Sequence, residues 1–284
     1  MSGAVVEAAL LKSAAAGALS LAFGGAPLGV LLIARRMSLV GDAMSHAILP
    51  GVAIAFLITG PDPVGLTIGA LIAAFVVAGA STAMSRLRAV PEDASFAVFY
   101  LAALALGVVL IGKVASANFT QALLFGEAGS FDRESLILAA SAATATLVSL
   151  ALFVRGFLGE GADPVFMRAS RAPGWALHLL LMMLVALNLV AGFRAFGALM
   201  TVGLMMIPAA AARFWARGYA GQAGAAVLIS ALASLTGILL AAVIQIEPGA
   251  VMTLAAATAF AVSALAGPRG SLIQSLPCRP HLEG

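Results

Sequence analysis

The feature that most constrains this chain is its long, uninterrupted runs of apolar residues. Hydrophobic residues make up 62% of its 284 residues, and charged residues make up only 10%. Soluble domains carry roughly 25% charged residues, so a chain with this composition has too few charges to cover a soluble surface. The runs also lack the alternation of apolar and polar residues that marks the strands of a membrane β-barrel. The sequence therefore predicts an all-α membrane protein, a polytopic bundle of helices in lipid.

The apolar runs also predict how many helices cross the bilayer. A helix needs about 20 mostly apolar residues to span the hydrocarbon core. Nine segments qualify, at about 9–33, 38–59, 63–84, 94–113, 134–156, 175–195, 197–215, 223–245 and 249–266. The junction near residue 196 is short, so one broken helix there would reduce the count to eight. Residues 1–284 are expected to form a single transmembrane domain, because no soluble domain and no repeat of 20–50 residues is visible.

The basic residues predict the orientation, because Lys and Arg favour cytoplasmic loops. Eleven of them fall in alternate gaps between the spans: Arg35, Arg36, Arg86, Arg88, Arg155, Arg168, Arg171, Arg213, Arg217, Arg269 and Arg279. The other gaps hold four: Lys12, Lys113, Arg133 and Arg194. This asymmetry predicts an N-terminus outside and a C-terminus inside. It also explains the basic pI without nucleic acid, so we expect no nucleic-acid partner.

Two connections are long enough to have a role of their own. The outer one, about 114–133, contains LFGEAGSFD and is semi-apolar. The inner one, about 157–174, contains DPVFMRAS, which predicts a short helix with Asp163 as its N-cap and Pro164 at its first position. A C-terminal tail follows at 268–284 and holds the single cysteine, Cys278, so disulfides and thiolate metal clusters are excluded.

Two ionisable residues lie inside the second apolar segment. Asp42 and His46 are four residues apart, so they share one face of a helix. Such residues are rare in lipid and usually face a cavity, a partner or a substrate path. Carboxylate and imidazole together suit a divalent transition metal such as zinc, manganese or iron. The alternative is that the two side chains only bond each other or a neighbouring helix. In either case Pro50-Gly51 predicts a kink or a break nearby.

Other polar residues in the spans are weaker candidates. His178 is expected near the inner membrane surface, and Asn188 is expected to hold helices together. Three histidines in total are too few for a membrane metalloenzyme. The segment from Gly107 to Lys113 fits G-x-x-x-x-G-K, but Val114 stands where Ser or Thr is required, and the segment lies in an apolar helix. The chain is therefore not expected to be an enzyme, to hydrolyse ATP or to hold a permanent cofactor.

Four segments together resemble the permease subunits of bacterial ABC importers for zinc, manganese and iron, the ABC-3 metal permease family. They are GAPLGVLLIARRMSLVGDAMSHAILPGVAIAF at 25–56, LFGEAGSFD at 124–132, DPVFMRAS at 163–170 and FGALMTVGLMMIPAAAARF at 196–214. Their order and spacing match the family across nearly the whole chain. The match of EDASFAVFY at 92–100 is looser, since relatives often have small residues at Phe99 and Tyr100.

The resemblance implies a multi-pass protein of the bacterial inner membrane, in contact with lipid. It implies a pore formed with a second permease subunit, identical or related, a cytoplasmic ABC ATPase on another chain, and an extracytoplasmic metal-binding protein. Asp42 and His46 match the Asp and His that relatives place at the metal path. Asp163, Pro164, Phe166 and Arg168 match the loop that couples to the ATPase, although relatives often have a Gly near Arg171.

The function expected from this resemblance is import of a divalent metal by alternating access, driven by ATP. The metal is zinc or manganese, or iron, and the version HAILPG with Pro50 resembles the manganese and iron members more than the zinc members. The alternative is a stand-alone secondary transporter driven by an ion gradient. Such proteins usually have buried carboxylates on several helices, whereas Asp42 is the one acidic residue deep within a predicted span.

Overall fold

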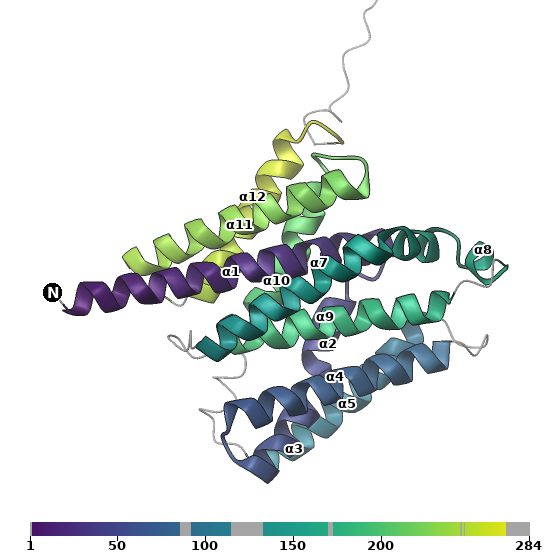
Figure 1. Ribbon diagram of the computed structural model, residues 1–284, viewed down its shortest axis with the longest axis horizontal. Helices are drawn as coiled ribbons and strands as arrows, with labels where there is room; N and C mark the ends of the chain where they lie inside the picture. The colour runs from purple at the N-terminus through teal and green to yellow at the C-terminus, as the bar shows by residue number, and fades with distance from the viewer. Residues whose placement is uncertain are drawn as a thin grey trace, which may run out of the picture.

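The computed structural model describes residues 2–85, 92–114, 133–169, 173–244, 246 and 248–270. These residues form a bundle of α-helices, most of which run along its long axis (Figure 1). The helices are α1 (Ser2–Ala34), α2 (Val40–Ala47), α3 (Leu49–Thr59), α4 (Pro63–Ser85), α5 (Glu92–Val114), α7 (Arg133–Ala162), α8 (Pro164–Ala169), α9 (Gly174–Phe196), α10 (Ala198–Ala212), α11 (Tyr219–Ile244) and α12 (Pro248–Ala266). The prediction of an all-α bundle is confirmed, and most predicted boundaries lie within a few residues of the observed ones.

Eight helical segments in the described part of the chain are long and apolar enough to cross a membrane. The segment predicted at 197–215 is the exception, because α10 has only 15 residues, about 22 Å at 1.5 Å per residue. It is separated from α9 by Gly197, whose φ of 84° lies in the left-handed region that favours glycine. Residues 174–212 are therefore two helices with a sharp turn between them, and the second is shorter than an ordinary span.

The course of α10 follows from its contacts with α9 and α12. Near its start, Thr201 lies against Gly192 of α9, where a Cβ would overlap the Thr201 side chain. Just beyond its end, Trp215 Nε1 donates to Ser263 Oγ of α12 at 2.9 Å. Because Gly249, at the start of α12, contacts the carbonyl of Phe196, α10 begins and ends beside the two ends of α12. It therefore turns back along α9 through the interior.

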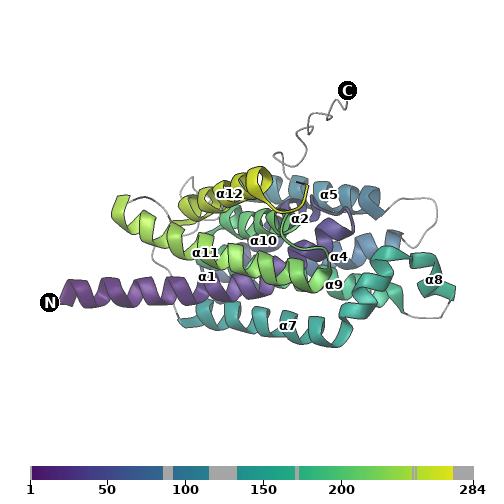
Figure 2. The same ribbon diagram turned by 90° about the horizontal axis from the view of Figure 1, so that it is seen from above.

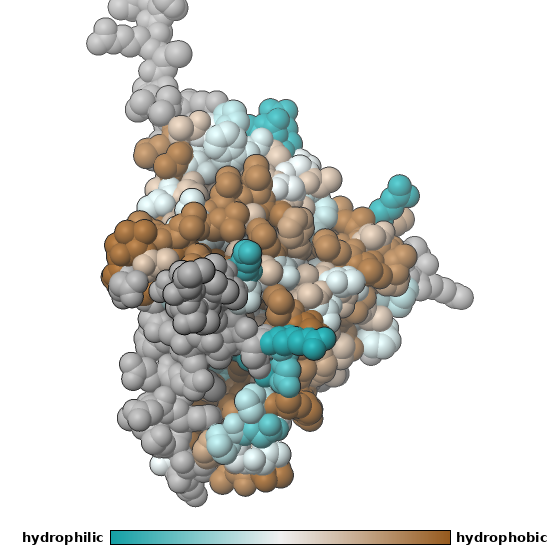
Figure 3. Space-filling view, turned by 60° about the vertical axis from the view of Figure 1, so that its left-hand side comes forward, coloured by the Kyte–Doolittle hydropathy of each residue, from teal (hydrophilic) through white to brown (hydrophobic). Residues whose placement is uncertain are grey.

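The outward surface is apolar over most helices, as a lipid-facing surface requires. Exposed hydrophobic residues include Val64, Ile68, Ile72 and Val76 on α4 and Leu228, Leu232, Leu239 and Val243 on α11. Figure 3 shows a face on which hydrophobic side chains cover much of the described surface and hydrophilic ones are scattered. This arrangement and the eight long apolar segments, one of them made of α2 and α3 together, identify a multi-pass membrane protein.

The N-terminus of α1 and the short helix α8 lie at opposite ends of the bundle (Figures 1 and 2). Helix α7 is longer than its predicted span of 134–156 and continues to Ala162, so the inner connection predicted at 157–174 is reduced to α8 and its flanking residues. The predicted outer segment LFGEAGSFD and the tail beyond residue 270 lie outside the described residues.

Candidate functional site

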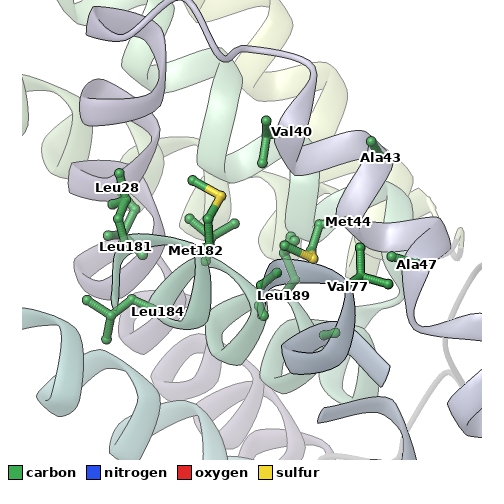
Figure 4. Packing of buried hydrophobic residues seen from close by; sticks show 14 of the residues in the cluster. Leu28, Val40, Ala43, Met44, Ala47, Val77, Leu181, Met182, Leu184 and Leu189 are labelled. Carbon is green, nitrogen blue, oxygen red and sulfur yellow. The ribbon is translucent and has the colours of Figure 1, made fainter. Parts of the chain in front are cut away.

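The candidate site lies on α2, a short helix that follows a tight turn at the end of α1. In Figure 1, α2 leaves the end of α1 and crosses behind the long helices before α3 continues beside α4. One face of α2 is buried in the core with Ala43: Val40 and Met44 extend toward Met182 and Leu189 of α9, and Ala47 lies beside Val77 of α4 (Figure 4). This packing holds α2 in place against α9, α4, α5 and α10.

Asp42 and His46 lie on the other face of α2. Asp42 is exposed and His46 is half-buried, whereas their neighbours Gly41, Ala43, Ser45 and Ala47 are all buried. The prediction that the two share a helix is confirmed, and their role in metal transport stays a prediction. Asp42 therefore points away from the core of this chain, and His46 lies at its edge.

The kink or break predicted at Pro50-Gly51 is observed as an interruption at Ile48, between α2 and α3. Pro50 has no N–H, so the carbonyl of His46 cannot receive the usual helical bond from the residue four positions later. The N–H of Ile48 donates to that carbonyl instead, α2 ends at Ala47, and Pro50 occupies the first turn of α3. The break therefore comes two residues before the proline, and His46 lies in the last turn before it.

Glycines of two other helices hold this break. Gly107 of α5 lies so close that a Cβ there would come within 2.7 Å of Leu49 Cβ and 3.0 Å of Pro50 N. Gly51 of α3 and Gly69 of α4 pack backbone against backbone, and a Cβ on either would overlap the carbonyl oxygen of the other. Gly51 and Gly69 thus form a close helix contact of the kind that small residues allow. Gly107 also marks a close helix contact. It lies within the continuous helix α5, so its segment is not a phosphate-binding loop, in agreement with the sequence.

Methionines of α10 lie behind the site. A Cβ on Gly41, next to Asp42, would come within 2.7 Å of Met205 Cε and 3.7 Å of Met206 Sδ. Met205 also contacts Gly25 and Gly29 of α1. These methionines fill the junction of α1, α2 and α10, which is the usual structural use of the residue.

Asp42 and His46 are two possible metal ligands on α2. Within the described part of the chain, no group of three or more His, Cys, Asp or Glu side chains could hold one. The buried polar residues there are Ser, Thr, His178 and Asn188, with no carboxylate among them. Among the described residues, Asp42 and His46 thus belong to no larger group of such side chains.

The predicted short helix is present as α8, with the predicted cap. Asp163 Oδ1 accepts a bond from the N–H of Phe166 at 2.8 Å, which is N-cap geometry, and Pro164 begins the helix. Phe166 is exposed, and Arg168 lies in the same helix. Helix α8 contacts the end of α7 and the start of α9.

The remaining polar candidates lie at helix contacts. Asn188 is buried in α9 and donates through Nδ2 to Thr146 Oγ1 of α7 at 2.7 Å and to the carbonyl of Leu184 at 2.9 Å. His178 is buried within the bundle, in the second turn of α9. It lies 3.5 Å through Nδ1 from Arg35 Nη1, a contact that sequence reasoning missed because it took Arg35 only as a topology signal.

Comparison with known proteins identifies the family. Residues 7–267 match the model of the ABC 3 transport family. The chain belongs to that family. It is thus a membrane permease subunit of ABC metal transport systems, and not itself an enzyme.

Three relatives place the chain within this family. It is 31% identical over 87% of its length, and 83% of the relative's, to the manganese transport system membrane protein MntC of Halalkalibacterium halodurans. It is 29% identical to the chelated iron transport system membrane protein YfeD of Yersinia pestis, over 75% of this chain and 70% of that one. The structure is similar to PsaBC from Streptococcus pneumoniae in complex with Fab, with a TM-score of 0.79, 27% identity and coverage of 93% of this chain and 94% of that chain.

Proposed function

We propose that this ABC 3 permease forms the pore of an ATP-driven importer of manganese, with iron(II) as the second candidate cargo. The observation that carries the proposal is the exposed pair Asp42 and His46 on α2, in a chain whose relatives are named for manganese and chelated iron transport. Zinc, the third metal expected from the sequence, has weaker support from these relatives.

The exposure of Asp42 argues that α2 faces another protein or a water-filled path. An ionised carboxylate that pointed into lipid would cost several kcal/mol, whereas next to water or a cation it costs little. A second copy of the chain, or a related permease, placed against this face would bring two carboxylates and two imidazoles together. Such a mixed oxygen and nitrogen set suits Mn²⁺ and Fe²⁺, and it doubles the two ligands that α2 of one chain offers.

The energy source in this proposal is a separate ATPase that docks at α8. The helix stands at the end of the bundle opposite the N-terminus (Figure 2), its cap is preformed by Asp163, and Phe166 is exposed for contact. With the Arg-rich gaps inside, as the charge asymmetry predicts, this end lies in the cytoplasm. A metal-binding protein then docks at the opposite end, and alternating access moves the ion past Asp42 and His46.

The test is metal uptake by the complete transporter in a strain that lacks its own manganese importers. The chain is expressed with the ATPase and binding protein of the same transporter, and the cell content of Mn, Fe and Zn is measured separately. Wild type is expected to accumulate manganese only when the ATPase is active. Asp42→Ala and His46→Ala are expected to lower uptake at least about tenfold, since each removes a ligand whose loss typically costs 1.4 kcal/mol or more of binding.

Glu134→Gln is the matched control, because it removes an exposed carboxylate whose ion pair with Arg194, at 2.9 Å, is far along the chain from α2. All three variants must be present in the membrane at equal amounts. Full uptake by both α2 variants would contradict the site. Uptake by the chain alone in ATP-free vesicles would favour the stand-alone secondary transporter instead.

A further inference from the structure

The inference concerns Arg35, the residue that follows α1. The turn after α1 is closed by bonds from Arg36 N to the Ile33 carbonyl, 3.1 Å, and from Met37 N to the Leu32 carbonyl, 2.9 Å. These are the two bonds of a Schellman motif, with Arg36 at the left-handed position at φ 62°. The turn is thus fixed in shape, and it leads within four residues from Arg35 to the start of α2.

The Arg35 side chain leaves this turn in the other direction and lies across two helices. Its Nη2 donates to the carbonyl of Phe157 on α7 at 2.8 Å. Its Nη1 lies 3.5 Å from Nδ1 of His178 on α9. It also covers the last turn of α7, where a Cβ on Gly161 would come within 3.0 Å of Arg35 Cγ and 3.2 Å of Nε. One guanidinium therefore joins α1 to both helices that flank α8.

The ends of these two helices form one unit with α8. Glu160 of α7 lies over Gly174, the first residue of α9, where a Cβ would overlap its carboxylate. Met167 of α8 folds back on α7, with its Sδ within 3.3 Å of where a Cβ on Gly159 would lie. A displacement of α8 is therefore carried by the end of α7 and the start of α9, which are the helices that Arg35 contacts.

Membrane topology alone does not account for this placement. The adjacent Arg36 is exposed and gives the same positive charge to the same turn. Arg35 is half-buried instead, and withdrawing a guanidinium from water costs free energy that its bonds must offset. A residue that only marks orientation has no need of bonds to two other helices.

We propose that Arg35 is the positioning residue that couples α8 to α2. Movement of α8, imposed by the ATPase, displaces the ends of α7 and α9. Arg35 transmits that displacement through the fixed turn to the helix that carries Asp42 and His46. The inference rests on the proposed function, because it assumes an ATPase at α8 and a metal path at α2.

The test compares Arg35→Gln with Arg36→Gln, which removes the same charge from the same turn. The chain is reconstituted in liposomes with the ATPase and binding protein of its transporter, and Mn²⁺ uptake and ATP hydrolysis are measured together. Arg35→Gln is expected to keep hydrolysing ATP but to use at least about fivefold more ATP per Mn²⁺, the lower end of typical coupling between sites. A purely structural defect would lower hydrolysis and uptake together and leave the ratio unchanged.

A second pair of variants decides the question if Arg35→Gln does not assemble. Gly161→Val places a β-branched side chain against Arg35 without removing any charge, whereas a Cβ on Gly224 of α11 would meet nothing within 4 Å. Gly161→Val is expected to raise the ATP used per Mn²⁺ relative to Gly224→Val. If Gly161→Val and Gly224→Val both assemble and use the same amount of ATP per Mn²⁺, the proposed role of Arg35 is overturned. Failure of wild type itself to transport Mn²⁺ would instead overturn the proposed function.

Discussion

The contact between α3 and α4 can be tested with two glycines on one helix. Gly69 and Gly79 both lie in α4. A Cβ on Gly69 would overlap the Gly51 carbonyl oxygen and come within 2.6 Å of Ala55 Cβ, whereas a Cβ on Gly79 would meet nothing within 4 Å. The same Gly→Ala change thus meets a crowded site in one case and open space in the other.

The magnitude follows from these distances. Carbon atoms in contact are about 3.5–4.0 Å apart, so Gly69→Ala requires α3 and α4 to separate by roughly 1 Å. Overpacking of this kind costs about 1–3 kcal/mol. The gain in helix propensity, up to about 1 kcal/mol, is common to both variants and cancels. We therefore expect Gly69→Ala to be less stable than Gly79→Ala by about 1–3 kcal/mol.

The assay is reversible unfolding of the purified chain in mixed micelles of mild detergent and SDS, followed by circular dichroism. Adding Ala55→Gly to Gly69→Ala removes one of the two clashes and is expected to restore part of the loss, a coupling between neighbouring sites. If Gly69→Ala unfolds at the same SDS fraction as Gly79→Ala, the backbone contact between Gly51 and Gly69 is not a stabilising element, and the reasoning is refuted.

Three further predictions concern single bonds and one strained turn. Asn188→Leu removes the bond to Thr146 and is expected to cost about 0.6–1.7 kcal/mol of stability in the same unfolding assay. If the double variant with Thr146→Val lost the full sum of the two single losses, the bond between Asn188 and Thr146 would be contradicted. Asp163→Ala removes the cap of α8 and is expected to cost about 1 kcal/mol of local stability, seen as faster hydrogen exchange of the Phe166 amide, whereas Asp163→Asn should exchange like wild type. Arg36→Gly relieves a left-handed backbone and is expected to stabilise the chain by about 1 kcal/mol, while Arg36→Ala should give no such gain.

Much of the candidate site could be predicted because its signals are local. The spacing of Asp42 and His46 places them on one face of any helix. Asp163-Pro164 predicts the start of α8, and the bond to Phe166 confirms it. The proline at position 50 predicts a disruption, and the observed break at Ile48 follows because a proline removes the donor for a carbonyl four residues earlier.

The role of Arg35 could not be found in the same way. Its contacts, Phe157 and His178, are 122 and 143 residues away along the chain. Two adjacent arginines after an apolar run are fully explained by membrane orientation, so nothing local distinguishes Arg35 from Arg36. The one hint in the sequence is that a single arginine after α1 would be enough to orient the helix in the membrane, so the second arginine is left without a role.

The sequence alone determined most helix boundaries to within a few residues, because span length, caps, glycine turns and prolines act locally, although α7 runs to Ala162 and α10 is only 15 residues long. Only the tertiary structure decided which face of each helix is buried. In lipid an apolar residue suits both the interior and the surface, so the residues of α4 and α11 carry no pattern that tells the two apart. Close contacts such as Gly51 with Gly69 and Gly41 with Met205 determine which face is buried, because a helix face with small residues can pack more closely than an equally apolar face with large ones. That choice of faces leaves Asp42 and His46 on the open side of α2.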